Sequence, residues 1–319
     1  MKTLLSAVLA AGLLSTMPLA NAQQDAVTPA PTQPEAGAAA PAAPAGEAVA
    51  PDAAGGHGGE AEEHHTVHYP LKHPASLDWS FAGMFGHWDV AQLQRGLKVY
   101  KEVCSACHSM NLVAMRSLGA LGYSEEQVKA FAAEYTVQDG PNGDGEMFER
   151  KAIPSDHFPA PYPNPEAAAA ANNGAAPPDL SLIAKGRAVE RGFPTFIFDI
   201  FTQYAESGPD YVHGLLTGYG QEPAADVVIQ PGTYYNPYFI SGPALAMPPP
   251  LSADQVTYDD GTQQTVDQYA RDVSAFLMWA AEPHLVERKQ TGLIVILFLA
   301  VFAGMLYIVK RRVWDGIAH

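Results

Sequence analysis

Cysteine is rare in this chain, with two residues in 319. A framework of several disulfides is therefore excluded. Basic residues are also scarce, because 18 Lys and Arg stand against 34 Asp and Glu and give a net charge of −16 at pH 7. Nucleic-acid binding needs clustered cations that neutralise phosphates, so we expect no nucleic-acid partner. An acidic surface instead favours a basic partner.

The segment 23–63 contains no aromatic residue, no leucine and no isoleucine. Ala, Pro and Gly make up 26 of its 41 residues, and its seven acidic residues are accompanied by no Lys or Arg. Such a segment buries too little apolar surface to offset its ordering entropy, so we expect a disordered acidic tail. A metal site is conceivable at four nearby histidines, but the flanking glycines and acids favour a solvated tail. These histidines are His57, His64, His65 and His68.

The first 22 residues have the pattern of a secretory signal peptide. Lys2 provides the positive start, Leu4–Leu14 the apolar core, and Ala20–Ala22 the small-x-small cleavage pattern. The apolar core is too short to span a bilayer comfortably, which disfavours an N-terminal membrane anchor. We therefore expect the residues after position 22 to be exported.

A second apolar run lies near the C-terminus and predicts a membrane anchor. Residues 292–309 contain no charged residue. This uncharged run of 18 residues is just long enough for a transmembrane helix. Lys310, Arg311 and Arg312 follow directly, as expected for a cytoplasmic flank and not for a buried core helix. We expect residues 64–286 to form a periplasmic head. Residues 287–319 would then be the single-pass anchor and short cytoplasmic tail of a bacterial inner-membrane protein.

The head has few helical signals for its size. Apolar spacing or capping patterns predict four helices, at residues 90–103, 124–135, 193–204 and 265–282. Two of them open on capping-box patterns, Ser124-x-x-Gln127 and Thr265-x-x-Gln268. Long segments rich in Pro, Gly and Asn separate the helices, notably at 136–181 and 218–263. Loops of this length indicate function, or packing around something other than protein.

Both cysteines belong to one motif, Cys104-Ser-Ala-Cys107-His108. C-x-x-C-H is the attachment signature of a c-type haem, because the two thiols can add to the two vinyl groups while the imidazole reaches the iron. A redox dithiol needs no following histidine, and a zinc site needs further ligands at defined spacing. The motif therefore predicts one covalently attached haem c.

The second axial ligand of the iron has to come from elsewhere in the chain. Met110 and Met115 are too near the motif to reach the opposite face of the ring, and Met278 lies on an amphipathic helix where core packing is expected. Met247 is in a loop whose following prolines fix the backbone, which suits a weak thioether bond. His213 is the alternative. Met/His ligation leaves no open site and indicates electron transfer.

Two further features have candidate roles at the haem. The turn-rich segment Asn172–Ser181, which contains Pro177 and Pro178, could lie along the ring. Arg187 follows shortly after and is one of several candidates to bind a haem propionate, since a guanidinium binds carboxylates bidentately. A surface arginine is the alternative.

These features together resemble the cytochrome c1 family, the haem subunits of quinol–cytochrome c reductase (bc1) complexes. The resemblance runs from about Asp78 to Arg312, and its specificity comes from several stretches in the same order. They are Gly96–Asn111 with the C-x-x-C-H motif, Asn172–Ser181, Tyr211–Tyr219, Ala246–Leu251 and the C-terminal anchor.

The resemblance implies thioether links at Cys104 and Cys107 and axial ligands His108 and Met247. It also implies further haem contacts, from Asn172, Pro177 and Pro178, from Arg187 at a propionate, and from Tyr211 in the pocket. The implied fold is mainly α. It is a class I cytochrome c-like haem domain with long loops, in which the 90–103 helix crosses the 265–282 helix, and a single C-terminal transmembrane helix follows.

The implied activity is the transfer of one electron from the Rieske iron–sulfur protein to a basic cytochrome c, while quinol is oxidised elsewhere in the complex, on cytochrome b. The chain alone would catalyse no reaction. The expected partners are therefore these three proteins and the lipid bilayer. Two alternatives stay open: a tail-anchored haem subunit of a terminal oxidase or nitric oxide reductase, and a haem enzyme or gas sensor with an open axial position.

The chain departs from the family in two places. The tail 23–63 lies outside the usual family core. Residues 188–208 form an insertion that resembles bacterial members, and some relatives stabilise this region with a disulfide for which this chain has no cysteine.

Overall fold

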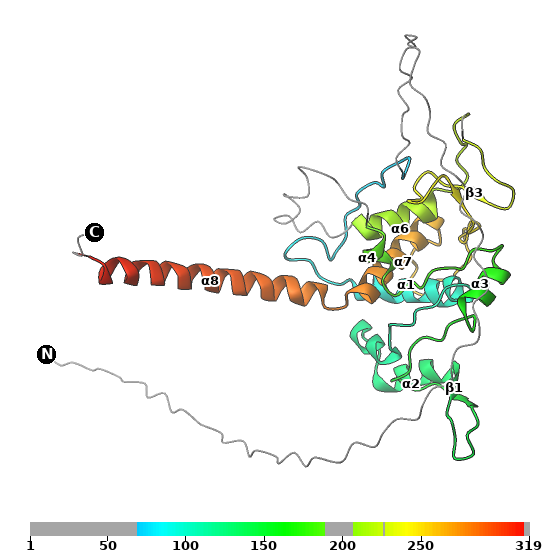
Figure 1. Cartoon of the computed structure of the whole chain (residues 1–319), viewed down its shortest axis with the longest axis horizontal. Helices are drawn as coiled ribbons and strands as arrows, with labels where there is room; N and C mark the ends of the chain where they lie inside the picture. Colours follow the sequence, from blue (N-terminus) through cyan, green and yellow to red (C-terminus); the bar gives the residue numbers. More distant parts are fainter. Residues whose placement is uncertain (1–68, 189–206, 226, 316–319) are drawn as a thin grey trace, which may run out of the picture. The chain divides into compact units, whose positions relative to one another are not determined.

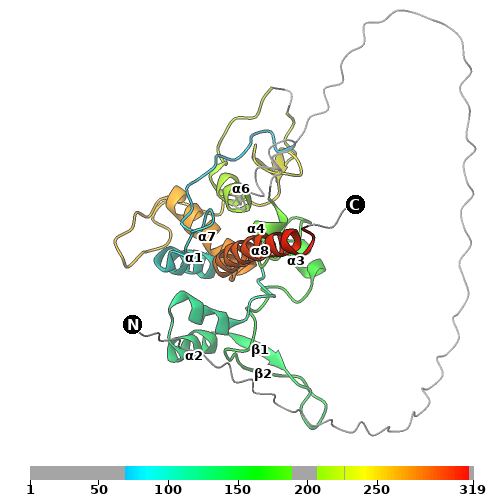
Figure 2. The same ribbon diagram turned by 90° about the vertical axis from the view of Figure 1, so that its left-hand side faces the viewer.

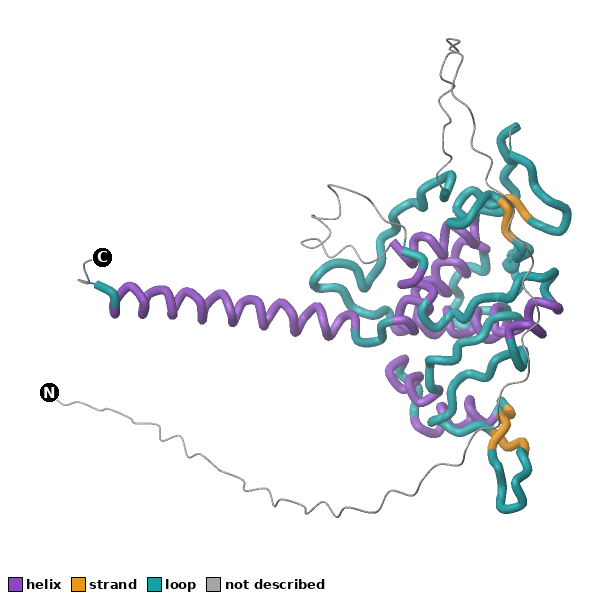
Figure 3. The backbone as a smooth tube through the Cα atoms, viewed as in Figure 1, coloured by secondary structure: helices purple, strands orange, loops and turns teal. Residues whose placement is uncertain are grey.

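The computed structural model describes residues 69–188, 207–225 and 227–315. Within these ranges the chain is mainly helical, with long loops and two small two-stranded sheets (Figure 1 and Figure 3). Several predictions lie outside the described residues: the signal peptide 1–22, the acidic tail 23–63, the four histidines, the helix 193–204 and most of the insertion 188–208.

Two helices predicted from the sequence form the centre of the head. Helix α1 spans Val90–Glu102 and helix α7 spans Val266–Ala281. The Thr265 side chain accepts a hydrogen bond from the Gln268 backbone amide, so the predicted cap of α7 is confirmed. The two helices pack on each other, and α7 also packs on helix α6 (Ser207–Thr217; Figure 2).

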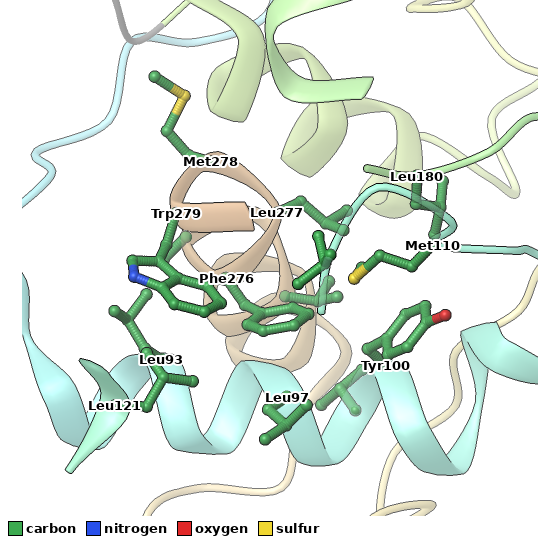
Figure 4. Packing of buried hydrophobic residues seen from close by; sticks show 14 of the residues in the cluster. Leu93, Leu97, Tyr100, Met110, Leu121, Leu180, Phe276, Leu277, Met278 and Trp279 are labelled. Atoms are coloured by element: carbon green, nitrogen blue, oxygen red, sulfur yellow. The ribbon is translucent and has the colours of Figure 1, made fainter. Parts of the chain in front are cut away.

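The hydrophobic core fills the contact between α1 and α7. Figure 4 shows side chains from both helices interleaved there, and most of them are almost fully buried: Leu93, Leu97, Tyr100, Phe276, Leu277 and Trp279. The helices approach closely because Gly96 has no side chain. A Cβ atom built there would lie 2.2 Å from the Asp272 carbonyl oxygen. Close packing of this kind tolerates no added methyl group.

Helix α2 (Glu125–Ala133) is capped as predicted, because the Ser124 side chain and the Gln127 side chain each bond the other residue's backbone amide. It ends two residues earlier than expected. An antiparallel hairpin of β1 (Thr136–Asp139) and β2 (Phe148–Lys151) follows inside a segment expected to be loop. Its four-residue strands are largely exposed, so they leave little apolar alternation in the sequence.

Several short elements complete the head. They are the 3-10 helices η1 (Cys104–Ala106) and η2 (Met115–Leu121), helices α3 (Pro165–Ala171) and α4 (Ile183–Gly186), and strands β3 (Tyr234–Tyr235) and β4 (Ala244–Leu245). Helix α6 was not predicted, because Gly208, Pro209 and Gly214 lower its helix propensity. Tertiary packing overrides that preference, since Gly208 lies directly against the Ala184 carbonyl oxygen of α4.

The C-terminal helix α8 spans Leu285–Val313 and is long and apolar enough to cross a membrane. It contains the predicted span 292–309 and begins seven residues before it. The extra turns are tied to the head, because the Lys289 ammonium group donates to the Phe81 carbonyl oxygen at 3.1 Å. The Trp88 indole donates to the Pro283 carbonyl oxygen at 3.2 Å, just before the helix.

Candidate haem site

The C-x-x-C-H motif directly follows α1 and forms one tight turn. The backbone amides of Cys107 and His108 both donate to the Cys104 carbonyl oxygen, at 3.1 and 2.9 Å. Burial, followed by the nearby Cys107, raises the pKa of the Cys104 thiol to about 12. The motif thus brings the two thiols and the imidazole together on one turn after α1.

The structure fixes the tautomer of His108. Its Nδ1 atom lies 2.8 Å from the Pro178 carbonyl oxygen, which can only accept a hydrogen bond. Nδ1 therefore carries the proton, and Nε2 keeps a free lone pair while the ring is neutral. Burial lowers the pKa of His108, although the Pro178 hydrogen bond and the Asp179 charge oppose that shift. A neutral imidazole with an oriented, unprotonated Nε2 is the form that binds a metal, so this residue fits haem iron.

A second set of hydrogen bonds joins the residues after His108 to the residues after Pro178. The Asp179 carboxylate accepts from the Ser109 hydroxyl and from the Asn111 amide, each at 2.8 Å. The Leu180 amide donates to the Ser109 carbonyl oxygen at 2.8 Å. The predicted turn-rich segment thus lies beside the motif. The sequence predicts no role for Asp179, because its only signal is a carboxylate directly after two prolines.

Met247 lies in a half-buried loop just after β4. The Tyr219 hydroxyl donates to its carbonyl oxygen at 3.0 Å, which fixes the backbone at this position. The other methionines considered as ligands, Met110, Met115 and Met278, are fully packed in the protein core. Figure 4 shows Met110 and Met278 among the side chains of that core. Met247 is therefore the methionine of this group that remains available to an external group.

The alternative ligand, His213, is engaged with a neighbouring helix. Its Nε2 atom lies 3.0 Å from a carboxylate oxygen of Asp267 on α7. That contact occupies the ring nitrogen with a structural partner. The sequence predicts no role for Tyr219, whose hydroxyl bonds the Met247 backbone, although this tyrosine ends the family-like stretch Tyr211–Tyr219.

The remaining predicted site residues lie in or beside helices α3, α4 and α6 and in the loop at Pro177 and Pro178. Asn172 ends α3 and its side-chain amide donates to the Ala168 carbonyl oxygen at 2.7 Å. Tyr211 is buried in α6, and its hydroxyl accepts from the Ile240 amide at 3.4 Å. Burial raises the pKa of Tyr211, while the Ile240 hydrogen bond and the charge of Arg187 oppose the shift, so Arg187 lies close enough to act on this ring. Pro177 is half-buried beside Pro178.

Comparison with known proteins identifies the family. The Cytochrome C1 family model matches residues 79–317. The chain is 56% identical over 244 residues to "Cytochrome b/c1" of Bradyrhizobium diazoefficiens, a match that covers 76% of this chain and 35% of that protein. This chain therefore spans about a third of the length of that relative. It is 48% identical over 242 residues to "Cytochrome c1" of Rhodospirillum rubrum, covering 76% of this chain and 88% of the relative.

A third relative gives the same assignment. The chain is 44% identical over 245 residues to "Cytochrome c1" of Blastochloris viridis, with 76% of this chain and 86% of the relative covered. The family match selects a bc1-type subunit over the oxidase and nitric oxide reductase alternatives. It also supports a c-type haem, and α8 fits a membrane anchor. The chain thus belongs to the cytochrome c1 family, the membrane-anchored haem subunits that carry electrons in bc1 complexes.

Proposed function

We propose that this chain holds one haem c covalently through Cys104 and Cys107, with His108 and Met247 as the axial ligands. The tautomer of His108 supports this ligation, because its Nε2 lone pair is free while Nδ1 donates to Pro178. The Tyr219 hydrogen bond supports Met247 by fixing its loop. Asn172, Pro177 and Pro178 would line the ring, Arg187 would pair with a propionate, and Tyr211 would close the pocket.

We infer that the function is to pass one electron at a time from the Rieske iron–sulfur protein to a cytochrome c. Bound haem supplies a one-electron couple between ferric and ferrous iron. With His108 and Met247 as its ligands, the iron would offer no open position to small molecules. This arrangement suits a relay better than oxygen chemistry.

The proposed partners are cytochrome b and the Rieske protein within one membrane complex, and a basic cytochrome c as acceptor. The exported residues 66–282 hold 25 acids against 12 bases. Such a surface attracts a basic partner and steers it by a field that salt screens. The proposed location is a bacterial inner membrane, with the head in the periplasm and the basic flank of α8 in the cytoplasm.

The observation that carries the proposal is the His108–Pro178 hydrogen bond, which prepares the motif's imidazole as a metal ligand. The test is to extract the protein from membranes in mild detergent. We expect a reduced-minus-oxidised spectrum with c-type and b-type haems and an iron–sulfur protein among the co-purifying subunits. Haem should stay on the chain in a denaturing gel, and Cys104→Ala should abolish most of that staining. Rapid carbon monoxide binding by the ferrous protein, or purification with an oxidase, would refute it.

A further inference from the structure

A short loop at residues 80–87 presents an apolar tip to solvent; we call it the juxtamembrane loop. Phe85 is 82% exposed, more than any large apolar side chain of the membrane helix α8. The loop contains no Asp, Glu, Lys or Arg. Lone apolar side chains are common on protein surfaces, so the surroundings of the loop decide what Phe85 contacts.

The base of the juxtamembrane loop is fixed. The His87 amide donates to the Ser80 carbonyl oxygen at 2.8 Å and closes the loop. Gly86 packs so tightly that an added Cβ atom would lie 2.4 Å from the backbone of Phe81. Phe81 itself is fully buried. Phe85 is therefore carried outward on a closed turn whose base belongs to the core.

The same loop is bonded to the start of the membrane helix. The Lys289 ammonium group of α8 donates to the Phe81 carbonyl oxygen, and Trp88 donates to the Pro283 carbonyl oxygen immediately before α8. Figure 1 shows the segment before α1 on the side of the head from which α8 leaves. Phe81 at one end of the juxtamembrane loop, and Trp88 directly after its other end, thus contact the point where the chain leaves the head.

The depth of the loop relative to the bilayer follows from helix geometry. Lys289 precedes the uncharged span, which starts at Gly292, by three residues, or about 4.5 Å of helical rise. The headgroup layer on each side of a bilayer is about 5–7 Å thick. The base of the loop therefore lies at the level of the lipid headgroups. Aromatic side chains are enriched at that level, where an apolar ring meets the acyl boundary.

We propose that the juxtamembrane loop inserts Phe85 into the headgroup–acyl boundary of the membrane, giving the head a second lipid contact besides α8. Lipid is favoured over a protein partner because the loop is bonded to the residues that enter the bilayer. The loop has no Asp, Glu, Lys or Arg whose burial in lipid would carry a large cost, and the exposed His87 stands at its base. The second contact would limit how far the head can tilt about the start of α8.

The test places a spin label at the tip. Phe85→Cys in the full-length chain is labelled with a nitroxide, and the intact complex is reconstituted into phosphatidylcholine–phosphatidylglycerol vesicles. Power saturation then compares collisions with oxygen, which partitions into lipid, and with a polar nickel chelate, which stays in water. Because Phe85 is exposed, the substitution leaves the core intact. Wild-type protein treated in parallel gives the background from Cys104 and Cys107.

Two control positions calibrate the measurement. Val228→Cys is a label on an exposed loop of the head, where Val228 is 76% exposed. Leu297→Cys is a label within the uncharged span. We expect the label at position 85 to collide with oxygen more than the label at 228 and less than the span control, and several-fold less with the nickel chelate than the label at 228. Nickel access equal to that at 228 would refute insertion. Protection from both reagents would place the loop against a protein subunit and also overturn the proposal.

Discussion

The Nδ1 atom of His108 lies 2.8 Å from the carbonyl oxygen of Pro178, a residue seventy positions further along the chain. Bonds from Ser109 and Asn111 to Asp179 extend the same contact. The haem motif and the Pro177–Ser181 segment thus form one hydrogen-bonded unit. A change in the second segment should therefore act on the histidine, although no residue there is expected to ligate iron.

Asp179→Asn tests this unit. Hydrogen bonds from Asn111, Ser181 and Ser109 lower the pKa of Asp179, although burial opposes them, so the carboxylate is the bonded form. Both oxygens of the Asp179 carboxylate accept hydrogen bonds, whereas an Asn side chain has only one acceptor oxygen. Its NH2 group would face one of the present donors, and that hydrogen bond would be lost. We expect a loss of about 1–3 kcal/mol in the stability of the head, seen as a lower Tm.

The matched control for this change is Asp144→Asn, on an exposed loop of the hairpin. It makes the same chemical substitution away from the motif and should leave Tm within error of the wild type. Equal Tm values for the two variants and the wild type would show that Asp179 contributes nothing to the unit.

Met247→Leu should leave the haem attached but lower its reduction potential well below the wild-type value, because the thioether favours ferrous iron. Tyr219→Phe should give a smaller fall, because it removes one hydrogen bond to the Met247 backbone. A neutral hydrogen bond is worth about 0.5–1.5 kcal/mol, which limits that fall to about 60 mV. Redox titration of the purified variants measures both. An unchanged potential in Met247→Leu would remove this residue as a ligand.

Gly96→Ala should destabilise the head. Alanine is the better helix former by about 1 kcal/mol, so helix propensity alone predicts a higher Tm. The added Cβ would instead meet the Asp272 carbonyl oxygen at 2.2 Å and the Phe276 Cβ at 2.6 Å. Overpacking of a close helix contact costs about 1–3 kcal/mol, so we expect Tm to fall. Gly119→Ala, which adds a methyl group in open space, is the control. A Tm for Gly96→Ala at or above the wild type would contradict the packing argument.

Glu282→Gln should reveal a pH-dependent contribution to stability. Ion pairs with Lys185 and Arg288 lower the pKa of Glu282 from 4.5, although burial opposes the shift. A depressed carboxyl pKa stabilises the fold above the unfolded value and loses that effect as the pH falls through the folded value. The Tm difference between wild type and variant should be largest near pH 7 and vanish as the pH drops below about 4.5. Because Lys185 and Arg288 are largely exposed, we expect about 0.5–1 kcal/mol.

The control for this measurement is the exposed Glu222→Gln, which should follow the wild-type curve at every pH. A difference between wild type and Glu282→Gln that stays constant as the pH falls from 7 to well below 4.5 would show that the ion pairs do not stabilise the fold.

Apolar spacing and capping residues in the sequence predicted the helices whose formation depends on neighbouring residues. The spacing of Leu93, Leu97 and Tyr100 indicated α1, and the caps at Ser124 and Thr265 located α2 and α7 within a few residues. Helical periodicity and capping bonds act within one turn, so a sequence window contains them. The chemistry of the C-x-x-C-H motif is equally local. Its role at a haem rests on the family match, and the ligand set stays a prediction.

Contacts between distant segments left no such signal. The bonds of His108 to Pro178 and of Tyr219 to Met247 depend on how loops meet in the folded chain. Helix α6 depends on packing that overrides the preferences of its Gly and Pro residues. The hairpin β1–β2 is short and largely exposed, so its strands carry no clear alternation.

The connection between α7 and α8 consists of three residues, 282–284. Such a linker reaches about 10 Å when fully extended, and Glu282 is further bonded to Arg288 on α8. A short linker and an ion pair therefore hold the head close to the start of its membrane helix. In the proposed electron relay, the head would then stay beside its anchor near the membrane, and its electron donor and acceptor would have to reach it there.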